Sequence, residues 1–418
     1  MQEIQYSHDI SKRQSLLFRN LIYLILVLIV FSYFEFFKFK AIPNTIKYLA
    51  SLVMLGVMLV FIILNILYSR GKPVKMNFSS ILIILVLSAI PSIFVAYTYH
   101  GQSFVMSVFA NSILLYYLLY FFVHFYKIPI KFILSLLIGI GLFAVLLYYA
   151  QYFTYPKMFL DITHMQGRGT VRLFVAGMLC TQLAYFFFLN RFLKNRTLLD
   201  IIIAMLCLSI FVLQGTRQHL FSLLFLTIVN IILARQVKSK MLILFFVFLG
   251  AVALFFVFRE IINELTRVST SQAQDLGGGI RIKAARFYLT TFQPGTMSYL
   301  FGNSAAAPGT KYTFNMAYYT MKYGFYVSDL GVLGDYIKYG VVFTITGLIF
   351  LARSILFKVG IEYSYLKYYI ASQCFTLIAG YGILGGVDIL IVLIVYIFDV
   401  DRSNRNRTNI QTGEITSG

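Results

Sequence analysis

Long, solid runs of apolar residues organise this sequence from end to end. Stretches of about 18 or more apolar residues recur along the chain and are separated by polar segments. Only helices and closed barrels can cross a bilayer, and the strands of a barrel would show alternating rather than solid apolar positions. The pattern therefore predicts an all-α polytopic membrane protein.

Run length indicates about 12 transmembrane helices, of which the eighth and the last two are short and are expected to be tilted or partly re-entrant. The first run is longer than the core of a signal peptide, and no small-residue cleavage site follows it, so we expect a retained span. The predicted spans cover residues 16–37, 46–68, 79–97, 104–126, 132–150, 170–190, 197–213, 220–234, 241–258, 329–351, 367–380 and 383–398.

Basic residues fall in alternate loops between these runs, which sets the expected orientation. Cytoplasmic loops of membrane proteins are enriched in lysine and arginine. Both termini are therefore expected in the cytoplasm, and the formal net charge of +20 needs no nucleic acid partner to explain it. The residues assigned to the cytoplasmic side are Lys12, Arg13, Arg70, Lys72, Lys75, Lys127, Lys131, Arg191, Lys194, Arg196, Arg235, Lys238, Lys240, Arg353, Lys358, Arg402, Arg405 and Arg407.

Loop lengths divide the chain into four parts. Residues 1–258 are predicted to form an N-terminal membrane region of about nine spans, and residues 329–398 a C-terminal membrane region of about three. Between them, residues 259–328 form a large extracytoplasmic loop, and a loop of this length in a compact protein is usually functional. Residues 399–418 are predicted to be a disordered cytoplasmic tail.

A second set of arginines faces the outside in this topology, where basic residues are uncommon and indicate an anionic ligand. Arg217 is the clearest case, because the connection 214–219 is short and a guanidinium fork matches phosphate oxygens. The alternative is an arginine that reaches lipid headgroups. The outward-facing arginines are Arg168, Arg172, Arg217, Arg259, Arg267, Arg281 and Arg286.

The large loop contains a glycine run, 277–279, followed by a predicted helix over 280–292. Arg281 lies in its first turn, and Lys283 and Arg286 are three residues apart and so share a face. A helix N-terminus with basic side chains suits an anion, although a glycine run is also a plain linker.

Tyrosine and phenylalanine are concentrated at 312–326, in the last part of this loop. A tyrosine offers an apolar ring and a polar tip, so Tyr318 and Tyr319 are candidates for stacking on sugars. The same composition is typical of an interfacial aromatic belt, and both interpretations remain open.

Asp329 opens the tenth predicted span without a charged neighbour in the sequence. Ionisable residues in spans are functional candidates, and we expect Asp329 to act as a general base or to position a hydroxyl. Asp335 and Lys338 are expected to neutralise each other, and Asp388 is a lesser candidate.

Metal and nucleotide binding have little support in the sequence. The outer histidines are scattered without ligand spacing, no P-loop is present, and the single D-x-D motif, 399–401, lies in the predicted tail, where a solvated role is expected. We therefore predict neither a metal ion nor another cofactor.

Four short motifs, in this order, resemble those of Wzy-type polysaccharide polymerases and the related O-antigen ligases. They are Gly215-Thr216-Arg217 between mid-chain spans, a late outer loop opening with Gly279-Ile280-Arg281 and a basic helix, a Leu300-Phe301-Gly302 turn, and Asp329 eleven residues before Gly340.

The resemblance implies a GT-C-like membrane glycosyltransferase that acts without metal on undecaprenyl-diphosphate glycans outside the bacterial inner membrane. Donor and acceptor would both be lipid-linked repeat units, and a chain-length regulator is left open as a protein partner. In this scheme Asp329 accepts the proton of the acceptor hydroxyl and Arg217 stabilises the diphosphate. Further diphosphate or substrate contacts would come from Arg281, Arg286, Lys283, Arg168, Arg172, Tyr318 and Tyr319.

Two other functions remain alternatives. O-antigen ligases usually carry histidine at the position of Asp329, so Ser328-Asp329 favours a polymerase. A lipid-linked glycan flippase or transporter would also meet diphosphate, but it would be expected to have shorter, more even loops and charges along a central cavity.

Overall fold

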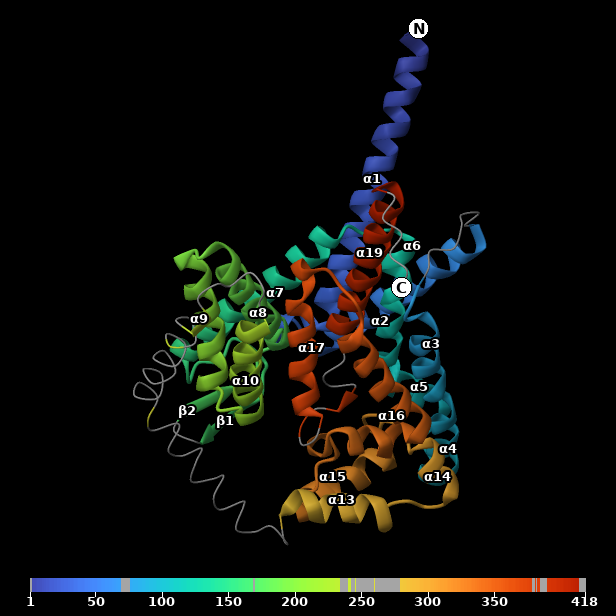
Figure 1. The fold of residues 1–418 in the computed structure, drawn as a ribbon. Helices are drawn as coiled ribbons and strands as arrows, with labels where there is room; N and C mark the ends of the chain where they lie inside the picture. The colour runs from blue at the N-terminus through green and yellow to red at the C-terminus, as the bar shows by residue number, and fades with distance from the viewer. Residues whose placement is uncertain are drawn as a thin grey trace.

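The computed structural model describes residues 2–68, 76–167, 170–233, 240–241, 245, 259, 279–377, 380, 382–383 and 389–412. It is about 80% helical. Five of its helices are long and apolar enough to cross a membrane, or six if one bent pair counts as a single crossing. The chain is therefore a helical membrane protein, as the apolar runs predict (Figure 1).

The N-terminal part contains four of the five candidate spans, at Leu16–Tyr33, Asn44–Tyr68, Ser79–His100 and Ile130–Thr154. The predicted span 104–126 is not straight, because the chain bends by 55° between Phe104–Ala110 and Ser112–Phe125. The elements are α1 (Gln2–Tyr33), η1 (Glu35–Lys38), α2 (Asn44–Tyr68), α3 (Ser79–Ser88), α4 (Ile90–His100), α5 (Phe104–Ala110), η2 (Ser112–Leu118), α6 (Leu119–Phe125) and α7 (Ile130–Thr154).

A short β-hairpin contains the only named strands in the described residues. Strands β1 (His164–Gly167) and β2 (Thr170–Leu173) are antiparallel, with His164 opposite Leu173. The prediction that a span begins at residue 170 is wrong, since the helix α8 (Met178–Asn195) begins later. Residues 170–173 alternate polar and apolar side chains, a pattern that suits a strand better than a span.

The remaining elements are shorter, apart from α16, the fifth candidate span, and α19. Most of the predicted span 241–258 lies outside the described residues. The elements are α9 (Leu198–Leu213), α10 (Arg217–Leu233), α13 (Ile280–Thr290), α14 (Thr296–Phe301), α15 (Lys311–Tyr323), η3 (Val327–Leu330), α16 (Val332–Leu356), η4 (Ile361–Tyr363), α17 (Tyr365–Thr376) and α19 (Ile389–Thr412).

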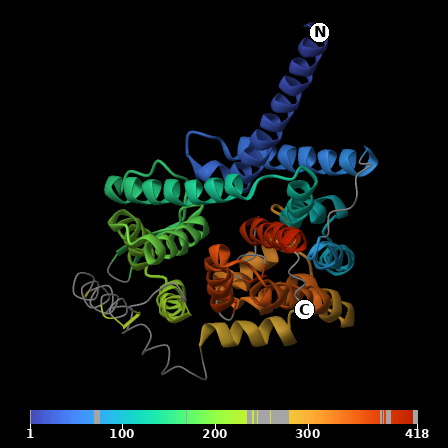
Figure 2. The same ribbon diagram turned by 45° about the horizontal axis from the view of Figure 1, so that its top comes forward.

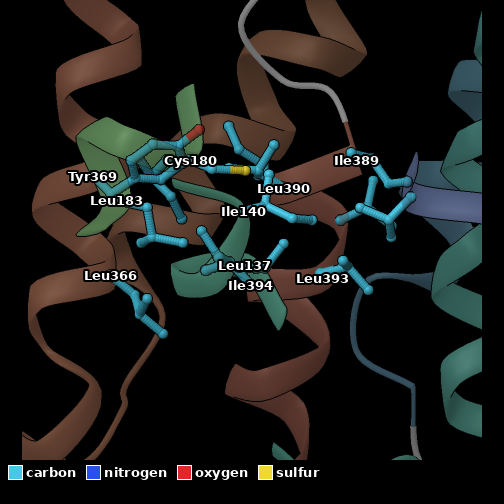
Figure 3. Packing of buried hydrophobic residues seen from close by; sticks show 14 of the residues in the cluster. Leu137, Ile140, Cys180, Leu183, Leu366, Tyr369, Ile389, Leu390, Leu393 and Ile394 are labelled. Atoms are coloured by element: carbon cyan, nitrogen blue, oxygen red, sulfur yellow. The ribbon is translucent and has the colours of Figure 1, made fainter. Parts of the chain in front are cut away.

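The main core lies where α7, α8 and α17 meet the apolar half of α19 (Figure 3). Leu137, Cys180 and Ile394 are fully buried there. At Gly141 a Cβ atom would lie 2.4 Å from the Cys180 carbonyl oxygen, so α7 and α8 touch backbone to backbone. Figure 2 shows α19 enclosed by the other helices, which explains why residues 389–398 are fully or almost fully buried.

The prediction of a disordered tail is wrong for residues 399–412, because α19 continues to Thr412. The expected solvation of the D-x-D motif is also wrong. Asp399 is 2% exposed and accepts hydrogen bonds from the Tyr120 hydroxyl and from the backbone and side-chain nitrogens of Asn77. Asp401 accepts from the Gly360 backbone at 2.8 Å and pairs with Arg405 at 2.9 Å. These acids hold the middle of α19 to α6 and to the segments before α3 and after α16.

Candidate functional site

The described part of the large loop folds into a compact unit of α13, α14, α15 and η3, which we call the outer segment (residues 279–330). It gathers at the end of the molecule opposite the N-terminus of α1 (Figure 1). Its own small core comprises Ala284, Tyr288, Val327 and Leu330, together with Ile337 of α16. The outer segment is thus packed onto the start of α16, next to the predicted catalytic carboxylate.

The cationic residues of helix α13 all lie off its buried face. Ala284 and Tyr288 are buried, and the Tyr288 hydroxyl donates to the Phe325 carbonyl at 3.1 Å. Burial, with a smaller repulsion from Tyr319, raises the pKa of Tyr288 to about 12. Arg281, Lys283 and Arg286 are all exposed. Lys283 and Arg286 lie away from the buried face, whereas Arg281 is three residues before Ala284 and lies along its edge.

Asp329 lies on η3, a single turn against α13. In a 3₁₀ turn residues three apart eclipse one another, and here Val327 and Leu330 are both buried. Asp329 is left exposed. Within the described ranges no hydrogen bond or ion pair reaches the Asp329 carboxylate. The backbone N–H of Asp329 donates to the Tyr326 carbonyl at 3.2 Å. An exposed acid therefore stands beside an exposed cationic helix.

Two motifs of the resemblance, Leu300-Phe301-Gly302 and Gly340, meet each other. Gly340 has φ +78° and interrupts α16. A Cβ at Gly340 would lie 2.2 Å from the Leu300 carbonyl oxygen, and a Cβ at Gly302 would lie 2.4 Å from the Lys338 backbone. Only glycine permits this approach together with a left-handed backbone.

The break in α16 leaves carbonyl groups for the outer segment to use. Asn303 donates its backbone N–H to the Ile337 carbonyl at 2.8 Å, and Ser304 donates to the Lys338 carbonyl at 2.6 Å. The turn after α14 is thus bonded into the membrane helix that follows Asp329. These hydrogen bonds fix the outer segment to α16.

Sequence reasoning missed a buried polar cluster behind this turn. His100, the last residue of α4, bonds through Nε2 to the Asn303 side-chain oxygen at 2.9 Å, and Asn303 donates to Gln293 at 2.8 Å. Asn111 donates to the Ser304 hydroxyl at 2.6 Å. Amide side chains in or next to apolar runs were the available signal, since buried polar groups need partners.

The two candidate sugar-binding tyrosines of α15 face different ways, because successive helical residues diverge around the axis. Tyr319 is half-buried, with its ring centroid 4.7 Å from that of Phe287 and 6.2 Å from that of Phe292. Tyr318 is exposed, and its hydroxyl accepts from Lys322 Nζ at 2.6 Å. That hydrogen bond raises the pKa of Lys322. The two rings therefore do not lie on one face of α15, and binding of substrate by Tyr318 or Tyr319 stays a prediction.

The β-hairpin is attached to the turn that precedes Arg217. Arg172 Nε donates to the Gln214 carbonyl at 2.7 Å, and Gln214 Nε2 donates to the Leu173 carbonyl at 3.2 Å. Gly215 has φ +60°, and α10 begins at Arg217. Arg172 thus positions the turn through its Nε. Arg168 and Asp388 lie outside the described residues, as does Arg267.

Gly380 connects the two turns that carry the predicted catalytic residues. Its carbonyl accepts the Gly331 N–H at 3.1 Å, directly after η3. On its other side, a Cβ at Gly380 would lie 2.8 Å from Gln218 Oε1, the side chain next to Arg217 in sequence. Nearby, a Cβ at Gly382 would lie 2.2 Å from the buried Asp335 carboxylate. The turns of Arg217 and Asp329, far apart in sequence, are thus linked through the Gln218 side chain and Gly380.

Across the described ranges, no group of three or more His, Cys, Asp or Glu side chains is arranged to hold a metal ion. No protein-family model matches the sequence, and a search of curated proteins returned no significant match. Function is therefore inferred from the residues of this chain and from the resemblance of its motifs.

Proposed function

We propose that this chain is a membrane glycosyltransferase that polymerises undecaprenyl-diphosphate-linked oligosaccharide repeat units of an O-antigen, capsule or exopolysaccharide. It works on the outer face of a bacterial inner membrane, with both termini in the cytoplasm. The proposal includes about 12 spans in a GT-C-like arrangement, some of them shorter than a full crossing.

The observation that carries the proposal is the position of Gly380 between the turn of Arg217 and the turn of Asp329. A glycosyl transfer from a lipid diphosphate needs a fixed cation at the leaving group and a proton acceptor at the attacking hydroxyl. Both must lie within the span of one sugar unit. The contacts on the two sides of Gly380 support the proposal because they link these two turns to one residue.

The proposed reaction forms one bond and breaks one bond. The acceptor hydroxyl oxygen attacks the anomeric carbon of the donor sugar, and its proton passes to the Asp329 carboxylate. The bond from the anomeric carbon to the diphosphate oxygen breaks, and undecaprenyl diphosphate leaves with the electron pair. Arg217 stabilises the growing negative charge, and the exposed Arg281, Lys283 and Arg286 of α13 hold the diphosphate or its glycan.

Deletion of the gene in its host, followed by sizing of glycan on the surface and on the lipid carrier, tests the proposal. Single repeat units in place of long chains are expected. Long chains stranded on the carrier would identify a ligase, and single units held on the cytoplasmic side would identify a flippase. Re-expression of Arg217→Ala and Asp329→Ala should fail to restore polymer, although both proteins reach the membrane.

A further inference from the structure

Helix α15 has an inner and an outer face. Tyr312 is buried, and Tyr319 lies in the ring cluster of the outer segment. The opposite face exposes Phe314 (67% exposed), Tyr318 (52%) and Met321 (84%). These three residues are spaced four and three apart, so they form one continuous stripe along the helix. We call it the α15 stripe.

Lysines border this stripe along one edge. Lys311, Asn315 and Lys322 are exposed and follow one line along the helix, beside Tyr318. Lys322 Nζ bonds to the Tyr318 hydroxyl and lies 5.1 Å from the Tyr318 ring centroid. An apolar stripe with lysines along its edge is the composition of a helix that lies in a membrane interface. Phe314 and Met321 offer a sugar no strong hydrogen-bonding group.

The position of α15 agrees with such a surface. Its Tyr312 ring stacks on the ring of His100, with the two ring centroids 4.1 Å apart. His100 is the last residue of the candidate span Ser79–His100. The helix therefore begins level with the end of a membrane-crossing helix. The adjoining α14 contacts α4 and exposes Met297 and Leu300, so apolar surface continues from the span towards α15.

We propose that the α15 stripe lies in the outer interface of the bilayer and that Lys311 and Lys322 contact anionic phospholipid headgroups. Aromatic and apolar side chains then enter the headgroup boundary while the lysine amines stay at the phosphates. The assignment gives Tyr318 to lipid instead of to glycan. It stands independently of the proposed glycosyl transfer.

The chain has no tryptophan, which makes a single-tryptophan experiment direct. Phe314→Trp reports the stripe, and Asn315→Trp, the neighbouring exposed residue on the lysine edge, is the matched control. Each variant is reconstituted in phosphatidylethanolamine and phosphatidylglycerol vesicles whose acyl chains are brominated near the headgroup end. Phe314→Trp should emit at shorter wavelength and lose most of its fluorescence, whereas Asn315→Trp should lose little.

Equal, weak quenching at both positions would overturn the proposal. Quenching at Phe314→Trp that appears only when a second copy or another protein is added would also overturn it. If Phe314→Trp does not fold, Met321→Trp reports the same stripe. The headgroup contact is tested separately with bromine on only one lipid. Phosphatidylglycerol should quench Phe314→Trp more than phosphatidylethanolamine does, and Lys311→Gln with Lys322→Gln should abolish that preference. A preference that survives both substitutions would refute the role of the lysines.

Discussion

Asp399 and Asp329 place the same side chain in opposite circumstances. Asp399 is buried, accepts hydrogen bonds from Tyr120 and Asn77, and lies 3.5 Å from His124 Nε2. Asp329 is exposed on a single turn beside the cations of α13. A carboxylate whose acceptor sites are filled by its own protein serves packing, whereas one left accessible can accept a proton from a substrate. We therefore assign Asp399 to the stability of the fold and Asp329 to the proposed reaction.

The sharpest test of this comparison is Asp329→Ala, which should lower polymer synthesis by about 10²–10⁴-fold because the attacking hydroxyl loses its general base. The free energy of unfolding of this variant should change by less than about 0.5 kcal/mol, since the Asp329 side chain is exposed. Ser328→Ala, at the neighbouring exposed position, is the control and should retain activity. Chain synthesis on purified lipid-linked repeat units measures the rate. Normal synthesis by Asp329→Ala would remove this residue from the chemistry.

Asp399→Ala should lower stability and leave the activity of the folded protein unchanged. Each buried donor left without its acceptor costs about 1–3 kcal/mol, so the melting temperature should fall. Unfolding can be followed with a thiol-reactive dye, because Cys180 and Cys207 are buried in the folded protein. The protein that remains folded should make chains of normal length. A stable but inactive Asp399→Ala would contradict the division of roles.

The contact between Gly340 and the turn after α14 allows a matched glycine comparison. Gly340→Ala combines a left-handed backbone with a clash against the Leu300 carbonyl. Gly309 has a similar φ, +76°, but no atom within 4 Å of an added Cβ. Both variants carry a backbone strain of about 1–3 kcal/mol. Any further loss of stability in Gly340→Ala is therefore the energetic cost of the clash with the Leu300 carbonyl. We expect Gly340→Ala to be less stable and to lose activity, and Gly309→Ala to keep activity. Equal stability would mean that the contact is dispensable.

Apolar runs specify the ordinary spans of this fold well. The predicted spans 46–68 and 132–150 correspond to Asn44–Tyr68 and Ile130–Thr154, because a bilayer admits little else for such runs. The prediction fails where partners distant in sequence decide the structure. The polar residues after residue 398 have the composition of a solvated tail. In the fold, Asn77 and Tyr120 donate hydrogen bonds to Asp399, and Gly360 donates one to Asp401.

The candidate site shows the same division. The sequence predicts the helix with Arg281, Lys283 and Arg286, since a glycine run and a local pattern mark it. It predicts neither the inward turn of Tyr319 nor the contact of Gly302 with the Lys338 backbone. It also gives no sign that Gly380 lies between the turns of Arg217 and Asp329. Those facts depend on tertiary packing, which a pattern of neighbours along the chain does not encode.

The smallest expected effect concerns the two sides of α13. Tyr288→Phe removes the hydrogen bond to the Phe325 carbonyl and keeps the buried ring, so it should cost about 1 kcal/mol of stability and leave polymer synthesis unchanged. Arg286→Ala, on the exposed side, should change stability by less than about 0.5 kcal/mol and reduce synthesis. The thiol-dye melting curve and the chain-synthesis rate measured on both variants decide the point. If Tyr288→Phe lost activity at full stability, the buried side of α13 would take part in the reaction, and the cationic side would no longer account for the function of this helix.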